Sequence, residues 1–149
     1  MSLNRVTGRL SVMTALVLLA PAAHSLDERG AKAVIAKFMG SQKIEGMDLS
    51  AREHVIADLN GDGRPDIVLL WDALGPTFGY SKMSIFLDQG KNYRTLTTDL
   101  GGQVEKLTVK GSTIVVDSLM PGPNDPRCCP TIKTQTRFQW TSDKLIRLK

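Results

Sequence analysis

Apolar residues recur along the chain with two different periods, and the first of these marks a helix. In the stretch LDERGAKAVIAKFMGSQ, residues 26–42, Ala31, Val34, Ile35 and Phe38 follow the i, i+3, i+4, i+7 spacing of an amphipathic helix. Acidic residues precede this stripe, where the helix dipole favours negative charge, and Gly40 is a candidate stop. We therefore expect one N-terminal helix that packs on the rest of the protein.

After residue 50 the pattern changes to short strands separated by turn residues. HVIAD and DIVLLWD flank an acidic loop, KMSIFLD and YRTLTTD are joined through residues 89–91, and VEKLTVK meets TIVVDSL at Gly111. Residues 132–140 alternate between apolar or threonine and charged or amide side chains, and DKLIRLK follows a Ser142-Asp143 turn.

The absence of alternation in DIVLLW places that strand at the centre of a sheet, buried on both faces. Together these segments predict an α+β domain. It consists of an antiparallel β-meander of about seven to eight strands, with the amphipathic helix packed on one face.

The first 25 residues have the features of a cleaved secretory signal. Arg5 and Arg9 precede an apolar run that is short for a membrane span, and Ala23 and Ser25 are small residues at the expected cleavage positions. Cleavage after residue 25 of the 149 leaves one domain, residues 26–149, and no membrane span. The expected location is periplasmic or secreted.

Charge and histidine content narrow the classes of function. The signal carries two of the 19 basic and none of the 15 acidic residues, so the mature net charge is +2 rather than +4. No basic run with base-stacking aromatics remains, and we expect no nucleic-acid partner. His54 is the one histidine of the mature chain, which argues against a histidine-rich zinc site. No nucleophile with a neighbouring base is evident, so we expect no enzyme.

The acidic loop DLNGDGRPD, residues 58–66, is the clearest candidate for metal binding. Asp58, Asn60 and Asp62 occupy positions 1, 3 and 5, Arg64 at position 7 offers its backbone carbonyl, and Asp66 occupies position 9. Oxygen ligands of this kind suit Ca²⁺. Without an ion, the same residues would form a turn held by hydrogen bonds from side chains to the backbone. Position 12 is a leucine within a strand, so the loop is not an EF-hand.

The motif D-x-N-x-D-G-x-x-D with a strand on each side resembles the calcium loops of FG-GAP repeats. That resemblance implies side-chain ligation by Asp58, Asn60, Asp62 and Asp66, and carbonyl ligation by Arg64. One such motif is present, so a full propeller of repeats is excluded by length.

Adjacent cysteines mark a second unusual segment, MPGPNDPRCCPTI. Cys128 and Cys129 are the two cysteines of the chain. In an oxidising compartment a vicinal disulfide is favoured, although it closes a small strained ring. A reduced pair, an intermolecular bridge, and a role in soft-metal or redox chemistry are the alternatives.

The N-G-D-G loop, the hairpin with a central glycine and the segment GPNDPRCCPT resemble a group of small exported bacterial envelope proteins. They share a D-P-x-C-C-P-[ST] signature near the C terminus. The resemblance covers most of the mature chain and implies an envelope location, without an established activity.

These observations predict a non-enzymatic binding or structural protein of the cell envelope, with an envelope protein or ligand as its partner. Recognition usually lies in loops carried on a rigid sheet, and Asn124, Asp125 and Arg127 are the candidate binding residues. The aromatics Trp71, Phe78 and Tyr80 could line the same face. The alternatives are a periplasmic inhibitor or immunity protein, and a thiol- or metal-handling protein that uses the adjacent cysteines.

Overall fold

The computed structural model describes residues 26–126 and 128–148. The predicted signal peptide, residues 1–25, and the predicted binding residue Arg127 lie outside the described residues. The chain forms one helix and eight strands in the order α1 (Glu28–Ser41), β1 (Asp48–Ala57), β2 (Asp66–Leu74), β3 (Gly79–Asp88), β4 (Tyr93–Asp99), β5 (Gln103–Lys110), β6 (Thr113–Met120), β7 (Ile132–Thr141) and β8 (Lys144–Leu148).

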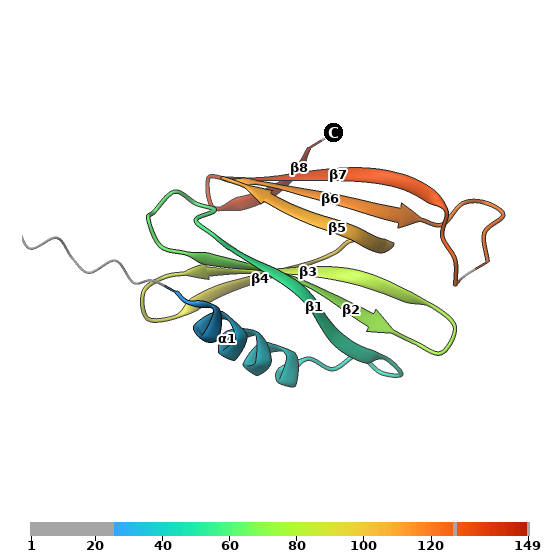
Figure 1. Ribbon diagram of the computed structural model, residues 1–149, viewed down its shortest axis with the longest axis horizontal. Coiled ribbons are helices and arrows are strands. Elements are labelled where there is room, and N and C mark those ends of the chain that lie inside the picture. Colours follow the sequence, from blue (N-terminus) through green and yellow to red (C-terminus); the bar gives the residue numbers. More distant parts are fainter. Residues whose placement is uncertain (1–25, 127, 149) are drawn as a thin grey trace, which may run out of the picture.

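The strands form two four-stranded antiparallel sheets rather than one continuous meander. Strands β1 to β4 form the first sheet and β5 to β8 the second, each in sequence order. The two sheets are stacked, and α1 covers the outer face of the first, so the molecule has three layers (Figure 1). The predicted α+β class, the antiparallel pairing and the number of strands are confirmed, whereas the division into two sheets was not predicted.

The break between the sheets lies at Gly101 and Gly102, between β4 and β5. Gly101 has a φ of +75°, a backbone conformation that glycine adopts without strain. A Cβ atom on Gly102 would lie 2.4 Å from the carbonyl oxygen of Leu119. The Ser81 amide also donates to the Gly102 carbonyl at 2.9 Å. The chain therefore crosses from one sheet to the other through a passage that has no room for a side chain.

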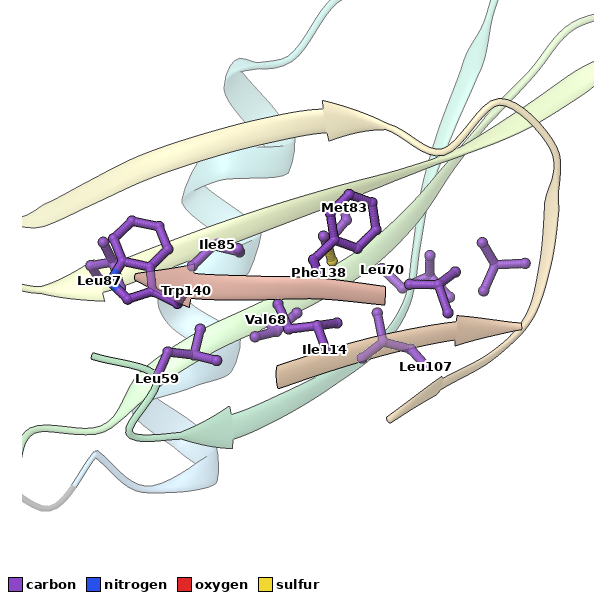
Figure 2. Packing of buried hydrophobic residues seen from close by; sticks show 12 residues of the cluster. Leu59, Val68, Leu70, Met83, Ile85, Leu87, Leu107, Ile114, Phe138 and Trp140 are labelled. Carbon is purple, nitrogen blue, oxygen red and sulfur yellow. The ribbon is translucent and has the colours of Figure 1, made fainter. Parts of the chain in front are cut away.

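The space between the two sheets holds the larger apolar core. Val68, Leu70, Met83 and Ile85 from the first sheet meet residues of the second, and Figure 2 shows this packing. The residues contributed by the second sheet include Leu107, Ile114, Phe138 and Trp140.

A second core lies between α1 and the outer face of the first sheet. Ile67, Leu69 and Trp71 of β2 point to this side, while Val68 and Leu70 point into the core between the sheets. All five side chains are buried, which confirms that DIVLLW is a central strand covered on both faces. The ring of Phe38 from α1 packs edge-on against Trp71 and Phe86, with centroids 6.0 and 5.0 Å apart.

The boundaries of α1 follow from local hydrogen bonds. Asp27 is the N-cap, and its carboxylate accepts the Gly30 amide at 2.7 Å. Gly40 lies inside the helix, which ends at Ser41, so the predicted stop at Gly40 is wrong by one residue. No helix within the described ranges is long and apolar enough to cross a membrane.

Strand β1 begins earlier than the sequence suggested, at Asp48 instead of near His54. His54 therefore lies within the strand and is half-buried. Its Nε2 lies 3.2 Å from the Glu28 carboxylate of α1, so it joins the helix to the sheet.

Candidate functional site

The acidic loop connects β1 to β2, and its first carboxylate organises the backbone of the turn. One oxygen of Asp58 accepts the amides of Gly61 and Asp62 at 2.8 and 3.2 Å, and the other accepts the amide of Gly63 at 2.9 Å. Gly61 and Gly63 have φ values of +76° and +80°. These left-handed conformations turn the amides inward, and glycine accommodates them without strain.

Asp62 is held by its neighbours in the same loop. It accepts the Asn60 side-chain amide at 3.0 Å, the Arg64 backbone amide at 2.8 Å and the Arg64 guanidinium at 2.6 Å. Burial on its own would raise the pKa of Asp62, but the hydrogen bonds from Arg64 and Asn60 and the Arg64 charge outweigh it and lower that pKa. Asp62 therefore remains charged beside a cation supplied by the chain.

Asp66 differs from the other loop carboxylates because it is fully buried at the start of β2. One oxygen accepts the Leu59 amide at 3.0 Å and the other the Asp88 amide at 2.8 Å. Burial raises the pKa of Asp66, the two amides oppose that rise, and the charges of Asp62 and Asp58 add to it. Asp66 thus links the acidic loop to the end of β3 and lies within electrostatic reach of the two other carboxylates.

The oxygen donors of the loop are of the type that binds a hard cation. Each carboxylate offers about four lone-pair sites, and each of the three carboxylates has capacity beyond its intramolecular hydrogen bonds. Within the described ranges, however, no three carboxylate, imidazole or thiolate groups converge as they would around an ion. The calcium site stays a prediction, and binding would require Asp62 to exchange its contact with Arg64 for the ion.

The carboxylates Asp66 and Asp72 both lie on β2, Asp66 at its first residue and Asp72 two residues before its last. They are six positions apart in an extended strand, which corresponds to roughly 20 Å. A glycosidase pair requires about 5–9.5 Å, so these two residues do not form one.

The cysteine loop lies between β6 and β7, at the end of the molecule opposite the acidic loop (Figure 1). Asp125 organises it from within: its carboxylate accepts the amides of Gly122 and Thr131, both at 2.7 Å, and the Thr131 hydroxyl. The Gly122 amide, with Thr131, lowers the pKa of Asp125 against the opposing effect of burial. The predicted binding residue Asp125 thus stabilises its own loop, and Asn124 is exposed beside it.

Cys128 and Cys129 have their sulfur atoms at disulfide distance, with Cα atoms 3.8 Å apart. This is the vicinal arrangement that the sequence favours. The carbonyl of Cys128 accepts a hydrogen bond from the Gln103 side chain at 3.2 Å, and the Cys129 amide donates to Pro126. The Cys-Cys ring is therefore joined to the start of β5.

A cleft of about 740 Å³ lies beside this loop. It is bordered by the tip of the β2–β3 hairpin, the start of β5 and Cys128. Of the three aromatics named as binding candidates from the sequence, Phe78 and Tyr80 line it, whereas Asn124 and Asp125 do not. The prediction for Trp71 is wrong, because its side chain is buried in the core between α1 and the first sheet. The lining also contains three charged residues that were not identified from the sequence as binding residues: Arg52, Asp72 and Glu105. They are scattered over three segments that only the fold brings together.

No family model matches this sequence, and no match was found among the curated proteins or the solved structures.

Proposed function

We propose that this protein is an exported, non-enzymatic binding protein of the cell envelope. Its three-layer body serves as a rigid scaffold, and recognition takes place at the end that carries the cysteine loop. The observation that supports this proposal most directly is the cleft of about 740 Å³, which falls in the range of roughly 300–1,000 Å³ that is usual for ligand sites. The signal-like leader and the resemblance to small envelope proteins support the location.

A calcium ion in the acidic loop is the second part of the proposal. Asp58, Asn60, Asp62 and Asp66 would supply side-chain oxygens and Arg64 its carbonyl. Since Asp66 already ties the loop to the end of β3, an ion shared with Asp58 would fix the loop against both strands. Ca²⁺ would therefore rigidify this end of the scaffold and would take no part in catalysis.

The binding function is tested by mapping amide shifts of ¹⁵N-labelled mature protein against fractionated envelope extract. We expect a ligand-containing fraction to perturb amides around the cleft, including Gly79, Gln103 and Glu105, with the extract components recovered unchanged. Chemical turnover of a component, or perturbations confined to other surfaces, would contradict the proposal.

A thiol-handling role is the second candidate, favoured by the vicinal arrangement of Cys128 and Cys129. The same mapping distinguishes it from simple binding. A thiol-handling protein would change its intact mass, or the redox state of a component, on contact with the extract.

A further inference from the structure

The cleft beside Cys128 is the open end of the space between the two sheets. Along β2, Val68 and Leu70 belong to the core between the sheets, and Asp72 and Leu74 continue on the same face into the cleft. The second sheet contributes Val104 and Leu119 from the opposite side. The apolar core is thus replaced by a mixed polar and apolar lining where the sheets end.

The polar part of this lining is a charge-compensated network. The Arg52 guanidinium donates to the Val104 carbonyl at 2.7 Å and lies 3.6 Å from the Asp72 carboxylate. Asp72 also accepts the Ser81 hydroxyl at 2.7 Å. An arginine has five N–H donors, so Arg52 retains donors toward the cleft beside the acceptors of Asp72.

The backbone at the cleft is not available for the addition of a peptide strand. The carbonyl of Val104 is taken by Arg52, and its amide donates to the Ser81 hydroxyl at 3.2 Å. The carbonyl of Gly102 accepts the Ser81 amide. Recognition by β-strand addition requires free backbone groups along an edge, so side chains must recognise the ligand here.

The apolar part of the lining is exposed to an unusual degree. Five large hydrophobic side chains are exposed among the described residues, and two of them, Leu74 at 47% and Phe78 at 44%, belong to this cleft. Both lie at the tip of the β2–β3 hairpin, where the Gly75 amide donates to the Phe78 carbonyl at 2.8 Å. The tip therefore presents apolar surface in a fixed conformation.

We propose that this cleft binds a neutral saccharide, with Phe78 against the apolar face of a sugar ring and the Arg52–Asp72 pair on its hydroxyl groups. A hydroxyl both donates and accepts, and it matches a lining in which donors and acceptors lie side by side. The described charges of the lining are those of Arg52, Asp72 and Glu105, with a net charge of −1, which disfavours an anionic ligand. This inference rests on the proposed binding function.

The test is an amide-shift titration of the mature, disulfide-intact protein with separate probes: cellobiose, lactose and di-N-acetylchitobiose as neutral disaccharides, glucuronic acid as an anion, and the tripeptide Gly-Phe-Gly. Each probe is added to about 20 mM, which saturates a site with a Kd near 1 mM. We expect at least one neutral disaccharide to shift the amides of Gly79, Gln103 and Glu105.

Two variants locate the binding. Phe78→Ala is expected to weaken the affinity by about tenfold, equivalent to about 1.4 kcal/mol, because it removes the aromatic platform for the sugar ring. Ile146→Ala, equally exposed at 45% but outside the cleft lining, should leave it unchanged.

Binding of the anion or the tripeptide at the cleft without any neutral disaccharide overturns the saccharide inference and leaves the binding function standing. An affinity that is unchanged in Phe78→Ala, or the absence of any shift at the cleft with all three disaccharides, also overturns it. The extract titration described above tests the binding function separately.

Discussion

Asp66 is fully buried and connects the acidic loop to the first sheet through two hydrogen bonds. Its carboxylate accepts the amides of Leu59, in the loop before β2, and of Asp88, the last residue of β3. Because the side chain is fully buried, water cannot replace it as the acceptor for these amides.

Replacement of Asp66 by alanine is expected to lower the free energy of unfolding by about 2–5 kcal/mol, since two buried amides lose their acceptor at roughly 1–3 kcal/mol each. Urea denaturation in the absence of Ca²⁺ measures this loss. The control is Asp143→Asn, at a side chain that is 82% exposed, which should change stability by less than about 0.5 kcal/mol. Equal effects of the two substitutions would contradict the structural role of Asp66.

The hydrogen bonds of Asp125 should make the conformation of the cysteine loop depend on pH. Its pKa is lowered from the usual 3.8, first by the Gly122 amide and then by Thr131. A carboxyl group whose folded pKa is depressed adds stability that is present above its unfolded pKa and is lost as the pH falls through the folded pKa. The Gly122 and Thr131 amide resonances should therefore titrate with a midpoint below 3.8. A midpoint at or above that value would contradict the hydrogen bonds, and Asp125→Asn should abolish the titration.

At the scale of elements, the second sheet begins where Gly101 and Gly102 let the chain cross between layers. The sequence did predict most strands, since the alternation along β7 and the turn residues at Gly111 and Ser142-Asp143 are local signals. The crossing was not predicted because two adjacent glycines are equally compatible with an ordinary turn. The contact of Gly102 with the Leu119 carbonyl is a tertiary constraint without a local signal.

Two glycine-to-alanine substitutions should have opposite effects. Gly102→Ala places a Cβ 2.4 Å from the Leu119 carbonyl and should cost about 1–3 kcal/mol of stability. Gly40→Ala meets nothing within 4 Å in α1 and should stabilise by about 0.5–1 kcal/mol. Thermal or urea unfolding of both variants measures the sign of the change in the free energy of unfolding. A neutral Gly102→Ala would show that the crossing has room that the structure does not provide.

Across the whole molecule, the two unusual segments of the sequence lie at opposite ends of the stacked sheets (Figure 1). The sequence identified both segments because their residue types are locally unusual: closely spaced carboxylates in one, adjacent cysteines among prolines in the other. It could not identify the cleft, because Arg52, Asp72 and Glu105 are ordinary strand residues until β1, β2 and β5 are brought together. The sequence also could not show that the Arg64 guanidinium would donate a hydrogen bond to the Asp62 carboxylate.

The two ends of the molecule have different tasks in the proposed function. The proposed ion stabilises the loop between β1 and β2 and does not touch the cleft. Ca²⁺ is therefore expected to change stability more than ligand affinity, and the calcium proposal is testable without a known ligand.

The thermal unfolding midpoint in about 5 mM Ca²⁺, compared with chelator and with Mg²⁺, tests this claim most directly. With a Kd on the order of 0.1–1 mM, Ca²⁺ would add about 1–2.3 kcal/mol and raise the midpoint by about 3–10 °C. The account predicts that Asp62→Ala loses the calcium shift, and that Arg64→Ala keeps or increases it, because Arg64 contributes only its carbonyl and its side chain competes for Asp62. An unfolding midpoint that is the same in Ca²⁺ and in chelator, for the wild type and for Arg64→Ala, would contradict it and leave a turn held by hydrogen bonds alone.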